Sequence, residues 1–183
     1  MHGLPGDAEP FEKLIRGHGY EDFRWLDPHD IVVAQWVRMK CAFGCGEFGK
    51  CAACPPNTPP VPECERFFRE YTRAVVIRFA KTVARPEDRR AWSREVNRKL
   101  LDLERAVFLA GHPKAFLLFM DSCHLCEECA PAREQCRHPK LARPAPEAMA
   151  VDVFTTVRAC GYPIEVLSDY GQEMNRYALL LIE

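Results

Sequence analysis

The sequence predicts an α+β or α/β fold, with a mixed sheet of about five strands, flanking helices and two cysteine-rich loops at strand ends. Three observations support this prediction. Strand-like and helix-like segments alternate along the chain, 48% of the residues are hydrophobic, and nearly all of the 10 cysteines fall in two short segments. Because 183 residues can bury one sizeable core, we expect a single domain over residues 1–183.

The predicted strands are runs rich in β-branched, aromatic and other apolar residues, bounded by proline, glycine or charged residues. They cover residues 30–38, 73–81, 114–120, 163–167 and 177–182. The run over 114–120 is apolar almost throughout, which is typical of a strand that is buried on both faces.

The predicted helices show apolar residues spaced by threes and fours. They cover residues 10–18, 62–71, 86–110 and 146–160. The longest, 86–110, places Trp92, Val96, Leu100, Leu103 and Val107 on one face and ends at a glycine, so we expect an amphipathic helix packed on the sheet.

Two loops contain nine of the cysteines. The first, residues 39–64, is rich in glycine and proline, a composition incompatible with a helix or a central strand. The second covers residues 121–139. Each loop follows a predicted strand, 30–38 or 114–120, so we expect both to leave from strand ends.

The second loop has the spacing C-x2-C-x2-C, formed by Cys123, Cys126 and Cys129, and Cys136 follows seven residues later. Three thiols this close can occupy three corners of a cubane while the fourth returns from a short loop. Structural zinc sites usually draw their ligands from two separated pairs. The spacing therefore favours a [4Fe-4S] cluster over zinc in this loop.

The first loop offers five thiols, one more than a single site needs. Cys41, Cys45 and Cys54 are the expected ligands, and the fourth is Cys51, Cys64 or a non-protein group. The pattern C-x3-C followed by C-x2-C also suits two pairs around zinc, so zinc remains an alternative to a second [4Fe-4S] cluster here. We expect Cys160, on an apolar helix face, to be a buried and inert thiol.

Composition excludes several functions. The net charge is -1 and the pI is near 6.6, so neither nucleic acid nor a membrane surface is an expected partner. The first residues have no apolar signal segment, and no apolar run is long enough to span a bilayer. We therefore expect a cytoplasmic protein whose cysteines bind metal, since disulfides are rare in a reducing cytosol.

Several motifs resemble one known family. They are K-C-x2-G-C-x2-F-G-K followed by C-P-P, then C-x2-C-x2-C-x6-C-R-x-P, R-P and E-A-x3-D-V, over residues 40–167. The chain resembles a family of predicted metal-binding proteins that has no established reaction. The resemblance implies a cytosolic iron-sulfur protein whose ligands are Cys41, Cys45 and Cys54 in the first motif and Cys123, Cys126, Cys129 and Cys136 in the second.

We expect the protein to carry one or two [4Fe-4S] clusters and to pass single electrons to a partner enzyme. The reason is that the sequence has two groups of cysteines and no pair of residues suited to acid-base catalysis. One alternative is an enzyme or cofactor-maturation factor in which an open iron binds a substrate. Another is a zinc-binding interaction module, which predicts a colourless protein with stoichiometric zinc.

Overall fold

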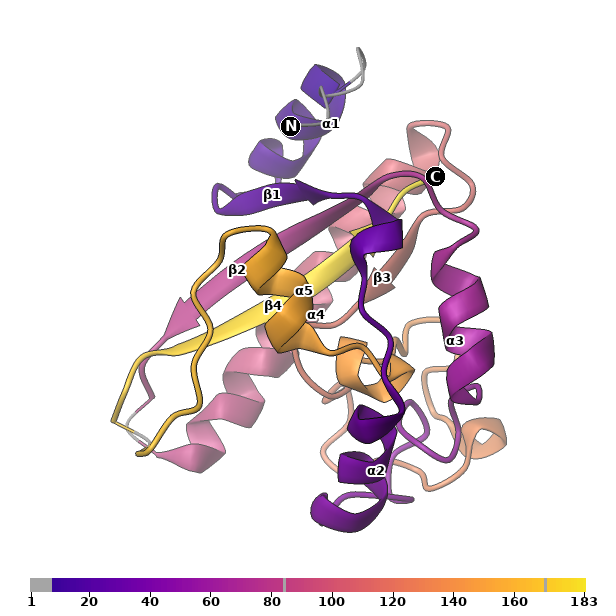
Figure 1. Cartoon of the computed structure of the whole chain (residues 1–183), viewed down its shortest axis with the longest axis vertical. Coiled ribbons are helices and arrows are strands. Elements are labelled where there is room, and N and C mark those ends of the chain that lie inside the picture. Colours follow the sequence, from indigo (N-terminus) through magenta and orange to yellow (C-terminus); the bar gives the residue numbers. More distant parts are fainter. Residues whose placement is uncertain (1–7, 84, 170) are drawn as a thin grey trace.

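The computed structural model describes residues 8–83, 85–169 and 171–183 (Figure 1). Within them, four strands form one sheet in the order β1-β2-β4-β3. The strands are β1 (Phe23–Leu26), β2 (Ala74–Lys81), β3 (Phe116–Leu118) and β4 (Met174–Leu181). The predicted combination of a sheet with helices is confirmed. The sheet has four strands instead of about five, and every neighbouring pair is antiparallel rather than mixed.

The two central strands, β2 and β4, pair along their whole length, from Ala74 opposite Leu181 to Lys81 opposite Met174. Successive side chains of a strand point to opposite faces, so each strand contributes to two separate cores. Val75 and Leu180 are buried in one core, and Val76 and Leu179 are buried in the other. The apolar runs of these strands thus reflect burial on both faces.

Helices cover both faces of the sheet (Figure 1). The first core contains residues of α1 (Ala8–Gly17) and of the long helix α4 (Pro86–Leu109). The second core contains residues of α3 (Val61–Phe68) and α5 (Val153–Ala159). The predicted helices 10–18, 62–71 and 86–110 therefore correspond to α1, α3 and α4.

Residues 30–38 do not form the predicted strand. A 3-10 turn, η1 (Pro28–Asp30), is followed by one isolated bridge between Val33 and Val151, and then by helix α2 (Gln35–Gly44). In this segment Val33 forms a single bridge with Val151 and no ladder follows, so the chain continues as helix α2. The first cysteine loop consequently begins inside a helix, whereas the second follows β3 as predicted.

Residues 146–160 do not form one helix. A 3-10 turn, η3 (Pro146–Met149), ends at Ala150, whose φ of 61° lies in the left-handed region, and Asp152 then caps α5 by accepting from the Thr155 amide. A second 3-10 turn, η2 (Arg133–Gln135), lies in the second loop. Residues 163–167 have no regular structure, and β1 is a strand that the sequence analysis missed.

In the part of the chain that the structure describes, no helix combines the length and apolar character needed to cross a bilayer.

Candidate metal centre

The second cysteine loop is anchored to α4 where it leaves β3. Asp121 accepts two hydrogen bonds from Arg89, donated by Nε and Nη2 and each 2.6 Å long, and a third from Ser93 at 3.1 Å. Burial alone would raise the pKa of Asp121, but the hydrogen bonds and charge of Arg89 outweigh it and the pKa is lowered. Asp121 is therefore a buried carboxylate that ties the start of the loop to the helix.

The end of the second loop is anchored to the same helix. Arg143 donates through Nε to Glu104 at 2.9 Å, and Glu104 also accepts from the Leu117 amide at 2.8 Å. Arg94, between these anchors, donates to the His124 carbonyl at 2.8 Å. The loop is thus held at both ends and near its first cysteine by side chains of α4 and by β3.

The side chain of Asn57 helps to hold the first cysteine loop against the second. Its amide nitrogen donates to the Cys51 carbonyl at 3.1 Å and to the Pro131 carbonyl at 2.6 Å. Arg38 of α2 holds the rest of this loop by donating to Thr58, to Pro59 and to the Ala148 carbonyl. These contacts bring two segments that are distant in sequence side by side.

Thiols from both loops meet at the edge of the first core. Cys51 and Cys123 are buried in it, and Cys54, Cys129 and Cys136 pack against it. The sulfur of Cys129 lies 3.5 Å from the sulfur of Cys51, and the Cys51 thiol is also hydrogen-bonded to Cys54. We call these five residues the thiol cluster.

Backbone amides point at sulfurs of the thiol cluster. The Ala52 amide donates to Cys129 at 3.4 Å, the Ala53 amide to Cys51, and amides at Leu125 and Arg143 to Cys123. An amide donor stabilises a thiolate more than a neutral thiol, and it thereby favours the deprotonated form that binds metal. Such donors are the usual surroundings of metal-bound sulfur.

The pKa values within the cluster diverge because the thiols interact. The hydrogen bond from Cys54 lowers the pKa of Cys51 to about 6, and the same bond, with burial, raises the pKa of Cys54. Burial raises the pKa of Cys123 and brings that of Cys129 to about 11. Of these four thiols, Cys51 therefore loses its proton first, and a bound metal cation would favour the deprotonated forms of Cys54, Cys123 and Cys129.

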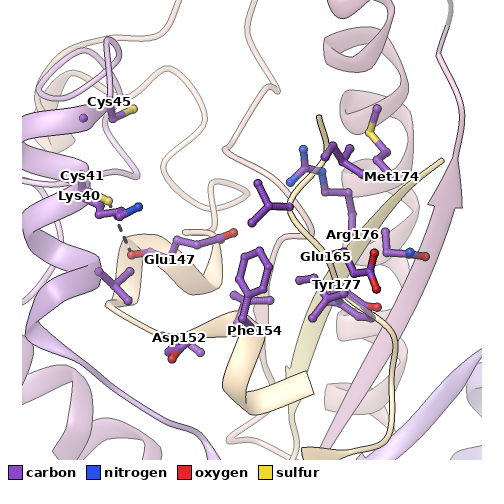
Figure 2. A pocket seen from close by; sticks show the side chains of 18 of the residues that line it. Lys40, Cys41, Cys45, Glu147, Asp152, Phe154, Glu165, Met174, Arg176 and Tyr177 are labelled. Atoms are coloured by element: carbon purple, nitrogen blue, oxygen red, sulfur yellow. Dashed lines mark hydrogen bonds between the residues drawn. The ribbon is translucent and has the colours of Figure 1, made fainter. Parts of the chain in front are cut away.

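Other predicted ligands lie elsewhere. Cys41 in α2 and Cys45 at its end line a separate cleft, where the Cys41 thiol contacts the Glu147 carbonyl at 3.9 Å (Figure 2). Cys126 is half-buried within the second loop. Cys64 belongs to the second core, where its thiol donates to the Pro59 carbonyl at 3.3 Å. Cys160 is half-buried at the end of α5 and packs against the second core.

All 10 cysteines are free thiols. Within residues 8–83, 85–169 and 171–183, no three His, Cys, Asp or Glu side chains are gathered around one point as metal ligands would be. The donor set nevertheless fits a thiophilic metal, since the cluster offers sulfur alone together with amide donors to it. Thiols that must lose protons to bind commonly take their final positions only when the metal arrives.

The sequence analysis missed three parts of this region. Asn57 was hidden in a proline-rich loop, and the Arg89–Asp121 pair joins elements that are far apart in sequence. Glu147 reaches into the cleft beside Cys41, where the surrounding protein raises the pKa of its carboxyl. The Glu147 side chain is exposed to water in the cleft, so we expect burial to raise its pKa only modestly. None of these residues shows a local pattern that would have identified it.

Comparison with characterised proteins and with solved structures found no match. A family model described as "Predicted metal-binding protein (DUF2284)" matches residues 24–182, a span that includes both cysteine loops, the anchors of the second loop and all of the sheet except Phe23. The chain therefore belongs to this family of predicted metal-binding proteins.

Proposed function

We propose that the protein binds one [4Fe-4S] cluster where its two cysteine loops meet, and that it passes single electrons to a partner enzyme. The proposal rests on the contact between the sulfurs of Cys51 and Cys129, which brings the two cysteine motifs together at one place. The ligands would come from the thiol cluster: Cys51, Cys54, Cys123, Cys129 and Cys136. Cys41 and Cys45 are only two thiols, too few to hold a second cluster by themselves.

The surroundings support iron-sulfur chemistry. When bound, such a cluster supplies a one-electron couple whose potential depends on hydrogen bonds to sulfur, nearby charge and burial. This chain provides amide donors to Cys51, Cys123 and Cys129, and it places the thiols against an apolar core. The anchors from α4 hold the second loop in position, so the protein around the cluster would move little when an electron arrives.

Zinc is a second candidate, and one distance favours it. Four sulfurs at about 2.3 Å from a zinc ion lie about 3.8 Å from one another at the corners of a tetrahedron. The separation of 3.5 Å between the Cys51 and Cys129 sulfurs is close to that edge. In that case the metal would join the two loops as a structural site with no redox role.

The deciding experiment is to purify the protein without oxygen, record its visible absorption, and count iron, sulfide and zinc per chain. About four irons and four sulfides, with a reversible reduction in voltammetry, would support the proposal. A colourless protein with stoichiometric zinc would support the structural site and overturn electron transfer. Cys160→Ser is the matched control for Cys129→Ser, because Cys160 is a half-buried thiol outside the thiol cluster.

A further inference from the structure

A second feature of the molecule is the large cleft that contains Cys41 and Cys45. Its volume is about 1580 Å³, and its walls come from α2, η3, α5, β4 and residues 164–169 (Figure 2). Most sites for small molecules occupy about 300–1,000 Å³. The cleft can therefore hold a ligand of considerable size, and it does not require any residue of the thiol cluster.

The cleft gathers apolar side chains that are exposed to solvent. Trp36 is 49% exposed, Met39 46% and Phe43 84%, all on α2, and Val166 on the facing segment is 84% exposed. Phe154 of α5 lies between these two walls (Figure 2). Large apolar side chains from separate elements that converge on one hollow indicate a surface that another apolar group covers.

One cation faces this apolar hollow from the sheet. Arg176 of β4 lines the cleft, and its Nε is buried without a hydrogen-bond partner among the residues that the structure describes. A buried donor without a partner is costly, and proteins rarely leave one unpaired. The Nε itself is closed to the cleft, so a ligand there would pair with the other donors of the half-buried Arg176 guanidinium.

The neighbouring charges leave room for such an acceptor. The carboxylates of Asp121 and Glu147 both act on Arg176, as does the positive charge of Arg89. Asp121 already accepts two hydrogen bonds from Arg89, so its charge is largely balanced. Lys40 adds a further cation to the cleft, on the wall opposite Arg176 (Figure 2). Glu147 acts directly on Arg176 and would compete with a bound anion. Asp152, Glu165 and Asp169 also contribute carboxylates to the lining, and the Asp152 carboxylate is engaged by Thr155.

We propose that the cleft binds a small organic anion with an apolar body, whose carboxylate or phosphate group pairs with Arg176. The apolar body covers Trp36, Met39 and Phe154. A guanidinium is well suited to this role, because its planar set of donors matches both carboxylate and phosphate oxygens. The site stands apart from the proposed function and does not depend on which metal the thiol cluster binds.

The test uses the full chain and three probes in isothermal titration calorimetry: decanoate, decanol and acetate. Decanoate combines both features, decanol lacks the charge, and acetate lacks the apolar body. We expect decanoate to bind about tenfold or more tightly than either of the others, because it alone satisfies both walls of the cleft. Equal affinity for decanol and decanoate would overturn the proposal without the need for any variant.

Variants then locate the anion. Arg176→Gln should weaken decanoate by about tenfold and leave decanol within about twofold, whereas Glu147→Gln should tighten decanoate by removing the competing carboxylate. Arg98→Gln is the matched control, since Arg98 is an exposed arginine of α4 that does not line the cleft. An Arg98→Gln variant that loses as much affinity as Arg176→Gln would contradict the assignment, and circular dichroism checks that each variant is folded.

Discussion

The sulfur of Cys51 lies 3.5 Å from the sulfur of Cys129, although α3, β2, α4 and β3 separate the two residues along the chain. Each residue belongs to a different cysteine motif. The two motifs therefore contribute to one cluster of thiols, and the nearest neighbours of Cys51 include a thiol of the other loop as well as Cys54 of its own.

Replacing Cys51 or Cys129 by serine is expected to remove most of the bound metal, because each provides a sulfur at the point where the loops meet. Metal per chain, measured by elemental analysis after anaerobic purification, gives the result. Cys64→Ser and Cys160→Ser are the controls, since both thiols pack with the second core. Metal loss in Cys64→Ser as large as in Cys51→Ser would place the site elsewhere.

Asn57→Ala is expected to lower the free energy of unfolding by about 1–3 kcal/mol, because it removes one hydrogen bond within the first loop and one to the Pro131 carbonyl of the second loop. It should also lower metal content, since the loops are no longer held together. Urea denaturation measures the first effect. Glu95→Gln, which breaks an exposed pair with Lys99 on α4, should change stability far less. Equal effects of the two variants would show that Asn57 does not join the loops.

Asp121→Asn is expected to destabilise the fold by about 2–4 kcal/mol, because it leaves the Arg89 guanidinium without its anion. The Arg89 side chain is 35% exposed and that of Asp121 is 9% exposed, so water recovers part of the cost. Thermal unfolding compares this variant with Arg85→Gln, which breaks a more exposed pair with Asp88. A melting temperature unchanged in Asp121→Asn would mean that the pair does not anchor the loop.

Removal of the metal is expected to expose the second loop to trypsin. Arg137 lies in this loop and Lys140 directly follows it, in a stretch with little regular structure, whereas Arg98 lies within α4. Local opening needs little free energy where few backbone hydrogen bonds must break. Mass spectrometry of timed digests should show the first cuts after Arg137 and Lys140 in metal-free protein, with Arg98 cut later. Identical rates with and without metal would indicate that the metal does not order this loop.

Stability should depend on pH through Glu183. The hydrogen bond from Arg73 lowers the pKa of this carboxyl, and His112 adds to the effect. A lowered folded-state pKa stabilises the fold above the unfolded value, about 4.3, and this contribution is lost as the pH falls through the folded value. The carboxylate is partly exposed, so the contribution is at most about 1 kcal/mol. Urea denaturation should separate wild type from Glu183→Gln at pH 7, and the difference should shrink below about pH 4. A constant difference would exclude this carboxyl as its source.

Local sequence patterns predicted much of the fold. The helical spacing of Leu100, Leu103 and Val107 depends only on residues within one helix, and it identified α4 correctly. The uninterrupted apolar run before Asp121 likewise identified β3. Patterns failed where distant partners decided the outcome: Val33 finds a single bridge with Val151, and Ala150 takes a left-handed conformation that divides the predicted helix 146–160.

The sequence by itself determined that sulfur is the available donor, and it located two cysteine-rich loops, because residue type and spacing are local properties. Only the tertiary structure decided which thiols meet. Cys51 and Cys54 join the second loop because Asn57 and the anchors from α4 bring the loops together, while the rigid helix α2 places Cys41 and Cys45 in the cleft. Contacts between segments so far apart depend on the packing of the whole sheet, and no local spacing records them.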